Sequence, residues 1–196
     1  SDEQDLAIRP DAQGRRRVVL ATSIAETSLT IEGVTTVLDS GWSRRSRFDP
    51  NSGLSRLETV RVSRASADQR AGRAGRLGPG ACYRLWTSAQ QSRLPERAPP
   101  EILNADLAGL VLDLAQWGVN DVSQLRWLDE PPAGACAQAR DLLTTLEALD
   151  GAGRITAAGR RMAAMALHPR LAHMLLRSMD SAQSALAADL AGLISE

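Results

Sequence analysis

Short apolar runs separated by polar segments characterise the first half of the chain. The runs at 18–22 (VVLAT), 34–40 (VTTVLDS) and 81–86 (ACYRLW) are rich in β-branched or aromatic residues. Runs of this length and composition are typical of buried strands. The intervening segment 23–33 has the polarity of a short helix or turn, and 67–76 has the length and polarity of a short helix. Strands that alternate with short helices predict part of an open α/β sheet.

Turn residues divide this first half further. Two polar, extended arms make up residues 42–63, and the turn-forming sequence DPNSG lies between them at 49–53. This composition predicts a β-hairpin. Ser66 is placed to cap the helix over 67–76, and the sequence GPG at 78–80 ends it.

The second half of the chain has the three- and four-residue apolar spacing of helices. It begins after a proline-rich boundary at 93–101. One stripe ends at Gly118, and a second is followed by a tight turn at 150–156, whose Thr156 can cap a third helix. Helix, helix, short β-wing and helix predict a winged-helix domain, with two more helices from Pro169 onward. The two stripes, which we expect to form core, comprise Leu103, Leu107, Leu110, Val111, Leu114 and Trp117, and then Ala139, Leu142, Leu143, Leu146 and Leu149.

The net charge of zero conceals an asymmetry between the halves. Residues 1–97 contain 16 arginines and 11 acidic residues, whereas 98–196 contain 7 and 12. Nine of the arginines lie within 44–76, and a local basic field of this kind attracts polyanions. All 23 basic residues are arginine. A chain without lysine lacks a complete P-loop, so it cannot be a self-sufficient P-loop ATPase.

The remaining reactive residues suggest structural roles. Cys82 and Cys136 lie far apart and have no metal-ligand spacing, so we expect two buried thiols in a reducing compartment. His168 and His173 have no matched carboxylate motif, which favours surface or packing roles, and no metal site is expected. No run of 18 apolar residues and no leader pattern is present, so we expect a soluble, cytoplasmic protein without a membrane partner.

The sequence QRAGRAGR at 69–76 carries the strongest chemical signal. Gln69, Arg73 and Arg76 are four and three residues apart and therefore share one helix face, whereas Arg70 points away. Two guanidinium groups and an amide can hold a γ-phosphate and its attacking water. We expect Arg73 and Arg76 to be exposed and Arg70 to be paired with acidic groups.

Two glycines in the same segment set this helix apart from an ordinary surface helix. A surface helix with arginine–carboxylate pairs would explain the arginines. It would not explain Gly72 and Gly75, since a glycine within a helix costs about 1 kcal/mol against alanine. The glycines would let a backbone or a phosphate approach closely. Upstream, the hydroxyls of Thr22 and Ser23 follow an expected strand at a helix start, where they could bond a nucleic-acid backbone.

Several long segments resemble one family in the right order. ATSIAETSLTI at 21–31 and QRAGRAGR at 69–76 resemble motifs V and VI of the DEAH-box helicases of superfamily 2. Residues 99–119, 127–132 and 153–176 resemble the winged-helix domain of that family and the start of its helical ratchet domain. The resemblance covers nearly the whole chain and is greatest to the bacterial HrpB-like branch.

The resemblance implies a three-part organisation. Residues 1–92 would be the C-terminal part of the second RecA-like lobe, 93–166 a winged-helix domain and 167–196 the start of the ratchet domain. Neither a Walker A sequence nor D-E-x-H occurs, so the chain is expected to be a piece of a longer helicase. Alone it should not hydrolyse ATP. ATP and Mg²⁺ would be held mainly by the first RecA-like lobe of the same protein.

The resemblance also assigns roles to individual residues. Arg73 and Arg76 would be arginine fingers, and Gln69 would help to place the attacking water. Thr30 and Glu32 correspond to positions near the nucleotide ribose, and Thr22 to a position that contacts the RNA backbone. The chain has Ser23 where the family usually has Asn, and Glu32 where Asp is common. The hairpin resembles the strand-separating hairpin of the family, and its arginines would meet RNA, or DNA, through Arg44, Arg45, Arg47 and Arg56.

Three hypotheses about function follow. The first is the second lobe and winged helix of an ATP-dependent RNA helicase. The second is a nucleic-acid-binding winged-helix module without nucleotide chemistry, which would have no need of Gln69, Arg73 and Arg76 on one face beside glycines. The third is an adapter whose acidic C-terminal half docks a protein partner through an exposed apolar patch.

Overall fold

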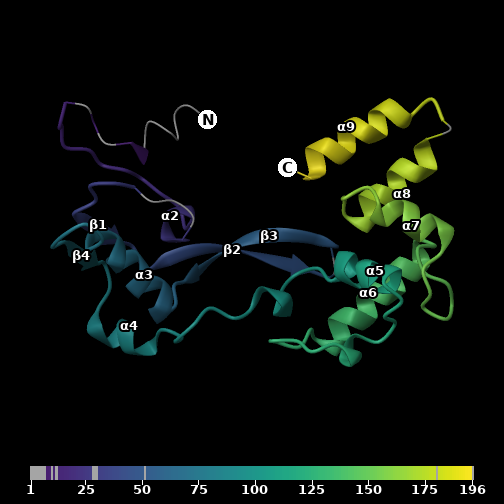
Figure 1. Ribbon diagram of the computed structural model, residues 1–196, viewed down its shortest axis with the longest axis horizontal. Helices are drawn as coiled ribbons and strands as arrows, with labels where there is room; N and C mark the ends of the chain where they lie inside the picture. Colours follow the sequence, from purple (N-terminus) through teal and green to yellow (C-terminus); the bar gives the residue numbers. More distant parts are fainter. Residues whose placement is uncertain are drawn as a thin grey trace. The chain divides into compact units, whose positions relative to one another are not determined.

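A computed structural model describes residues 8–9, 11, 13–27, 31–50, 52–179 and 181–195 (Figure 1). Its internal contacts divide the chain into two compact units, Ser1–Pro99 and Pro100–Glu196. Each unit is described below by itself. The finer division at 92/93 and 166/167, expected from the sequence, stays a prediction.

The first unit contains a parallel pair of strands covered by a helix. Strands β1 (Thr36–Asp39) and β4 (Ala81–Arg84) pair in parallel, with Thr36 opposite Ala81, and α3 (Arg64–Ala74) packs against both (Figure 1). A parallel pair requires a crossover connection, and the crossover here contains both the hairpin and α3. After β4, α4 (Ser88–Arg93) begins with a capping box between Thr87 and Gln90. The predicted α/β character is confirmed.

The expected strand at 18–22 is wrong. Residues 13–22 form neither strand nor helix, and Val18 and Leu20 are 89% and 94% exposed. A parallel strand exists only when hydrogen-bonded to a neighbour, and within the described ranges no strand pairs with this run. Hydrophobicity alone therefore did not place these residues in the sheet. The helix that follows, α2 (Ile24–Thr27), has four residues.

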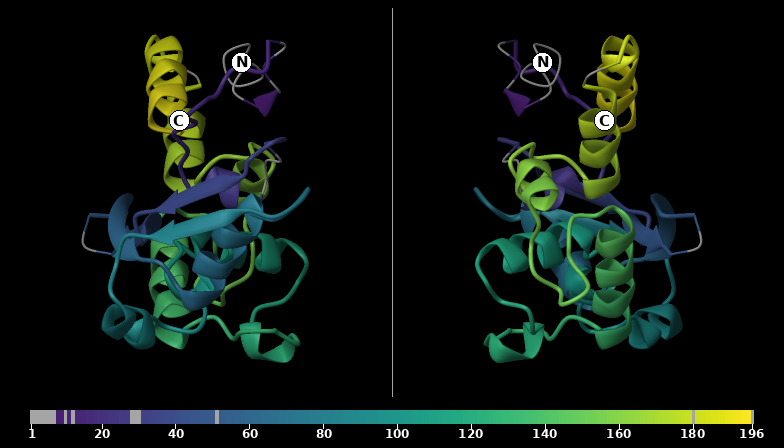
Figure 2. Two further views of the ribbon diagram at one scale, coloured as in Figure 1. Left: turned by 90° about the vertical axis from the view of Figure 1, so that its left-hand side faces the viewer. Right: turned by 90° about the vertical axis from the view of Figure 1, so that its right-hand side faces the viewer.

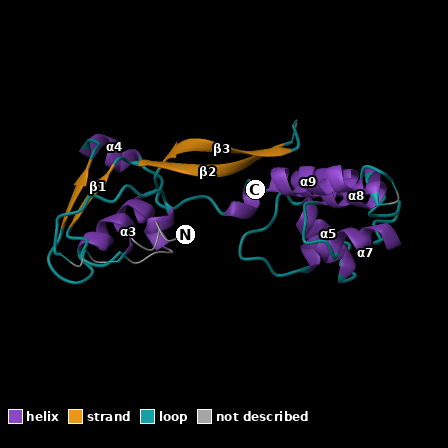
Figure 3. Cartoon of the chain, turned by 90° about the horizontal axis from the view of Figure 1, so that it is seen from above, coloured by secondary structure: helices purple, strands orange, loops and turns teal. Residues whose placement is uncertain are grey.

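The predicted hairpin is confirmed. Strands β2 (Trp42–Asp49) and β3 (Leu54–Arg61) are antiparallel, from Trp42 opposite Arg61 at the base to Asp49 opposite Leu54 at the tip. Figure 3 shows them as a long two-stranded ribbon. Gly41 begins the hairpin at φ +76°, and a Cβ there would lie 2.8 Å from the Trp86 ring, so glycine is required.

Helix α3 begins and ends earlier than the sequence suggested. Its cap is Ser63, whose hydroxyl accepts a hydrogen bond from the Ser66 backbone N–H at 3.1 Å. The predicted cap, Ser66, instead lies in the first turn. Ser63 follows the end of β3 and is 2% exposed. Its buried hydroxyl satisfies a backbone N–H of the first turn that has no partner within the helix, and this fixes where α3 begins. The helix ends at Ala74, with Gly75 as its C-cap.

The second unit is helical, as expected. Its first three helices are α5 (Ala108–Gln116), α6 (Ala133–Thr145) and α7 (Ala157–Ala163), with short 3₁₀ turns at Glu101–Leu103 and Val122–Gln124. An antiparallel bridge between Leu149 and Ile155 forms the small wing between α6 and α7. Thr156 caps α7 by accepting from the Gly159 N–H. Helices α8 (Pro169–Ser178) and α9 (Ser184–Ser195) then pack against each other (Figures 1 and 2).

The core of this unit contains most of the two predicted stripes. Two predicted members, Leu103 and Trp117, are 44% and 75% exposed. Both lie outside α5, where helical periodicity no longer aims a side chain at the core, so their assignment to the core was wrong. The buried cluster comprises Leu107, Ala108, Val111, Leu112, Ala115, Cys136, Ala139, Leu143, Ala148, Leu149, Met162 and Ala172.

The two cysteines are free thiols in different environments. Cys136 is buried as expected, whereas Cys82 is only half-buried. Burial raises the pKa of both thiols, so they stay protonated at neutral pH. Within the described ranges, no helix has the length and hydrophobicity needed to cross a membrane.

Candidate functional site

A depression of about 380 Å³ lies between α2 and the C-terminal end of α3. It is lined by Gln69, Arg73 and Arg76 together with Gly72 and Glu26. The three side chains that the sequence placed on one face therefore come together. Arg76 lies just beyond the end of α3, in the turn after the C-cap, rather than on the helix itself.

Arg73 is held more closely than the sequence suggested. Its guanidinium donates a hydrogen bond to the backbone carbonyl of Glu26, and the residue is half-buried. The expectation that Arg73 and Arg76 are both exposed is therefore wrong for Arg73 and confirmed for Arg76. The physical reason is the packing of α2 against α3, which brings the Glu26 carbonyl within reach of the Arg73 guanidinium.

The two glycines differ in role. Gly72 lies within α3, whereas Gly75 is the C-cap with φ −97°, so only one glycine interrupts the helix. A Cβ built at either position would meet no described atom within 4 Å. The expected close approach of another part of the chain is therefore not seen among these atoms. Both glycines instead leave open space beside the arginines.

Arg70 points to the other side of α3 and joins three elements. Its Nε lies 3.0 Å from Glu26 Oε2, and its Nη1 lies 2.9 Å from Asp39 Oδ1 and 3.1 Å from the Trp42 carbonyl. Asp39 is 3% exposed and also accepts from the Gly41 N–H at 2.9 Å. Arg70 thus ties α2, β1 and the first residue of β2 together. The predicted pairing of Arg70 with acidic groups is confirmed.

The structure gives less support to the other residues of this unit that were predicted to contact nucleotide or nucleic acid. Thr22 and Ser23 are exposed just before α2. The contact of Thr22 and Ser23 with a nucleic-acid backbone stays a prediction. Glu32 is exposed in a turn, and Thr30 lies outside the described residues. Neither Glu32 nor Thr22 lines the depression on α3.

The hairpin separates its arginines between two faces. Directly opposite residues of an antiparallel pair share a face, so Arg45 lies with Glu58, and Arg47 with Arg56. We call these four residues the charged face. Arg44 lies on the opposite face, with Trp42, Phe48 and Leu57. The sequence grouped all four arginines together, and the register shows that only Arg45, Arg47 and Arg56 share one surface.

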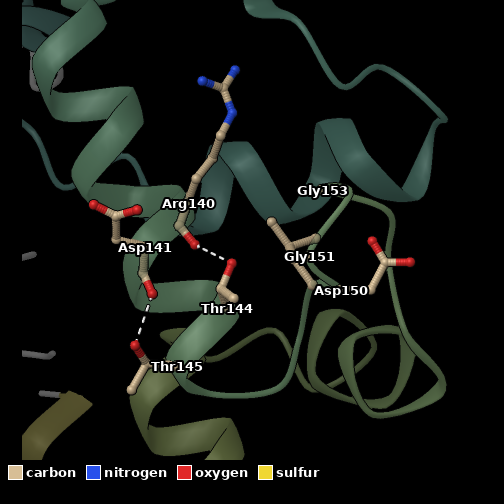
Figure 4. Close-up of a pocket in the computed structure, with 8 residues that line it drawn as sticks. Arg140, Asp141, Thr144, Thr145, Asp150, Gly151 and Gly153 are labelled. Atoms are coloured by element: carbon tan, nitrogen blue, oxygen red, sulfur yellow. Dashed lines mark hydrogen bonds between the residues drawn. The ribbon is translucent and has the colours of Figure 1, made fainter.

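A second depression, of about 510 Å³, lies beside the wing in the other unit. Figure 4 shows that its polar groups are already used locally: the Thr144 and Thr145 hydroxyls bond the carbonyls of Arg140 and Asp141. The Asp150 carboxylate accepts from the N–H groups of residues 152 and 154 and pairs with the Arg154 side chain. These backbone hydrogen bonds, first among several causes, lower the pKa of Asp150. The groups stabilise the wing turn.

Sequence reasoning missed a histidine–carboxylate pair in the second unit. His168 Nε2 lies 2.9 Å from Asp106 Oδ2, and its Nδ1 accepts from the Arg170 N–H and caps α8. Partial burial, the largest single influence, raises the pKa of Asp106, but the hydrogen bonds from His168 and from the Ala108 N–H, together with nearby positive charge, outweigh it, and the pKa lies below its usual value. The two residues are 62 positions apart, so no local sequence motif could have predicted the pair. Among the described residues, no group of three or more potential metal ligands lies together.

Two segments of the chain match known helicase domains. Residues 1–78 match the helicase conserved C-terminal domain, and residues 139–167 match the winged-helix form of the helicase associated domain, HA2. The chain therefore contains a helicase C-terminal domain and the winged-helix part of a helicase associated domain, and the resemblance to the DEAH-box helicases noted in the sequence is confirmed.

Individual relatives agree with this assignment. The chain is 49% identical over 195 residues to the ATP-dependent RNA helicase HrpB of Escherichia coli. This alignment covers 100% of the chain and 24% of HrpB. It is 42% identical over 181 residues to the pre-mRNA-splicing factor ATP-dependent RNA helicase prp22 of Schizosaccharomyces pombe, over 92% of this chain and 16% of that protein. Two crystal structures of E. coli HrpB match the whole chain with TM-scores of 0.86 and 0.92. The chain spans about a quarter of the length of HrpB.

Proposed function

We propose that this chain is the second-lobe and winged-helix portion of an ATP-dependent RNA helicase. The identity to HrpB extends over the whole chain and supports this assignment. In this proposal residues 1–92 complete the second RecA-like lobe, 93–166 form the winged helix and 167–196 begin the ratchet domain. Its partners are RNA and the first RecA-like lobe of the same protein, in the cytoplasm.

One observation carries the nucleotide part of the proposal. Gln69, Arg73 and Arg76 line one depression, while Arg70 faces away and is occupied by Glu26 and Asp39. This division places two guanidiniums and an amide at one depression that an external anion could enter. Arginine side chains suit a γ-phosphoryl group because they stabilise the negative charge of its transition state.

The depression fits a polyphosphate. Its side-chain donors are cationic or neutral, and Gly72 leaves room for the phosphate oxygens. Glu26 also lines it, but the carboxylate of Glu26 is paired with Arg70. ATP bound on the first lobe would supply the γ-phosphoryl group, with Mg²⁺ held mainly by that lobe. Arg73 and Arg76 would contact the oxygens that become more negative during transfer, and Gln69 would orient the attacking water. Thr30 and Glu32 would lie towards the ribose.

The contact between Arg73 and the Glu26 carbonyl adds a step to this mechanism. Arg73 must exchange this partner for phosphate, or hold both, when the lobes close around ATP. Because Glu26 belongs to α2, which follows Thr22 and Ser23, the exchange would act on the segment proposed to contact the RNA backbone. Binding of the nucleotide phosphate by Arg73 would thus be coupled to the nucleic-acid contact made by Thr22 and Ser23.

Steady-state ATPase kinetics of the full-length protein test the proposal. Arg73→Ala and Arg76→Ala should each reduce turnover by about 10³-fold or more, as arginine fingers do elsewhere. The affinity for ATP should fall less, since the fingers favour the transition state over the ground state. Arg64→Ala is the matched control, because Arg64 is an exposed arginine at the other end of α3. Turnover near the parental value in both variants would instead favour a binding module without nucleotide chemistry.

A further inference from the structure

The charged face of the hairpin contains a pair of like charges that the fold does not separate. Arg47 and Arg56 are directly opposite in the register, where Cβ atoms lie about 4.5–5.5 Å apart. Like charges in such positions destabilise a hairpin. Both side chains are well exposed, at 60% and 67%. An anion between them would therefore be favourable.

Glu58 supplies an anion at this position. Its Oε2 lies 3.6 Å from Arg47 Nη1, and its Oε1 lies 3.3 Å from Arg56 Nη2, so each carboxylate oxygen faces one guanidinium. Arg45 lies directly opposite Glu58 on the same face. These four side chains carry a net charge of +2, and Asp49, at the tip of the same face, lowers it to +1. Both ion pairs are long and solvated, and exposed pairs of this kind contribute little to stability.

We propose that Arg47 and Arg56 form a binding site for one phosphodiester group of single-stranded nucleic acid, and that Glu58 is the intramolecular anion which the phosphate displaces. The inference rests on the proposed function, because it takes the hairpin as a nucleic-acid contact. Two guanidiniums can each donate two hydrogen bonds to a phosphate, which is a stronger arrangement than two long contacts to a shared carboxylate. Glu58 keeps the arginines together before binding and weakens binding itself.

Glu58→Gln isolates this role. It removes the charge, retains the size of the side chain and leaves the arginines in place. In the full-length protein without nucleotide, its affinity for oligouridylate should rise about 3- to 10-fold, the range expected for two released exposed ion pairs. The slope of log affinity against log salt should stay close to that of the parent, because both proteins contact the same phosphate. A slope steeper by about 0.7 would mean one additional phosphate contact on the single strand and would contradict displacement.

Asp68→Asn is the matched control. Asp68 is an exposed carboxylate paired with Arg84 elsewhere in the same unit, so it tests the effect of overall charge alone. Arg47→Ala and Arg56→Ala should each weaken binding. The gain from Glu58→Gln should shrink in the Arg47→Ala background, because half of the site is then missing. Thermal melts of every variant establish that each is folded.

The outcomes separate the inference from the proposed function. If Arg47→Ala and Arg56→Ala bind as the parent does, the hairpin is not a nucleic-acid contact and the inference fails, whereas the proposed function is tested separately by the ATPase turnover of Arg73→Ala and Arg76→Ala. If these variants bind weakly but Glu58→Gln matches Asp68→Asn, only the displaced-carboxylate idea fails. Parallel titrations with oligodeoxythymidylate should show the same gain. Weaker RNA binding with stronger DNA binding would assign Glu58 to a ribose 2′-hydroxyl and overturn the inference.

Discussion

Replacement of Arg70 by alanine should lower the free energy of unfolding of the first unit far more than replacement of any exposed arginine. Arg70 is 16% exposed, and its partners Glu26 and Asp39 are 12% and 1% exposed at the side chain. In Arg70→Ala the Asp39 carboxylate would retain only the Gly41 N–H among its present partners. Its second oxygen already has no hydrogen-bond partner within the described part of the chain.

The magnitude follows from this burial. Breaking a buried ion pair by removing one partner costs about 3–5 kcal/mol, because the other charge is left uncompensated. For a unit of this size, such a loss lowers Tm by at least about 12 °C. Arg64→Ala on the same helix should change the free energy of unfolding by less than about 0.5 kcal/mol, since that side chain is exposed.

Urea unfolding followed by hydrogen exchange and mass spectrometry measures the effect, because peptides from the first unit are reported separately. The double variant Arg70→Ala/Asp39→Asn provides the internal test. If the cost arises from a stranded carboxylate, neutralising Asp39 should recover about 1 kcal/mol or more of the loss. A loss below about 1 kcal/mol in Arg70→Ala, or strictly additive effects in the double variant, would refute the reasoning.

Three other predictions concern the second unit. Gly159→Ala should cost about 1–3 kcal/mol in urea denaturation, since a Cβ would lie 2.2 Å from the Ala148 carbonyl oxygen; an unchanged midpoint would contradict this. Because the folded pKa of Asp106 is lowered, the stability from its contact with His168 is complete above the unfolded pKa of about 3.9 and disappears as pH falls through the folded value. Asp106→Asn should flatten acid unfolding profiles in that window, and parallel profiles would count against the pair. A segment covering 100–196 should bind duplex DNA poorly in a gel shift, because its acidic balance repels the backbone.

The choice of segment in the last experiment depends on the tertiary structure. The sequence placed the end of the winged helix at residue 166. Ala172 of α8 is fully buried in the same core as Leu143 and Met162, so truncation at 166 would open that core. The contacts that define the second unit extend to its last helix.

Local chemistry determined much of what could be predicted. The DPNSG sequence specifies a turn, and it produced the hairpin at the expected place because turn residues act within a few positions. Thr156 caps α7 for the same reason. The four-residue spacing of Gln69 and Arg73 put both on one face of α3, since helical periodicity is also a local property, whereas Arg76 reaches the same depression from beyond the end of the helix.

Tertiary structure decided everything that depends on a partner distant in sequence. The run at 18–22 is apolar but has no neighbouring strand to pair with among the described residues, so it forms no strand. Helical spacing separates Arg70 from Arg73 and Arg76, but it does not identify the partner of any of the three. Packing of α2 and β1 against α3 buries Arg70 beside two carboxylates and gives Arg73 a carbonyl partner, while Arg76 stays exposed.

The hairpin shows the same division at the scale of single residues. Its existence is encoded in the turn, but which arginines share a face depends on register, because directly opposite residues of two paired strands project to the same side. The sequence by itself determined the family, the hairpin and the arginine-rich helix. Only the folded chain set Glu58 between Arg47 and Arg56, since charges that are distant along a chain interact once pairing brings them within a few ångströms.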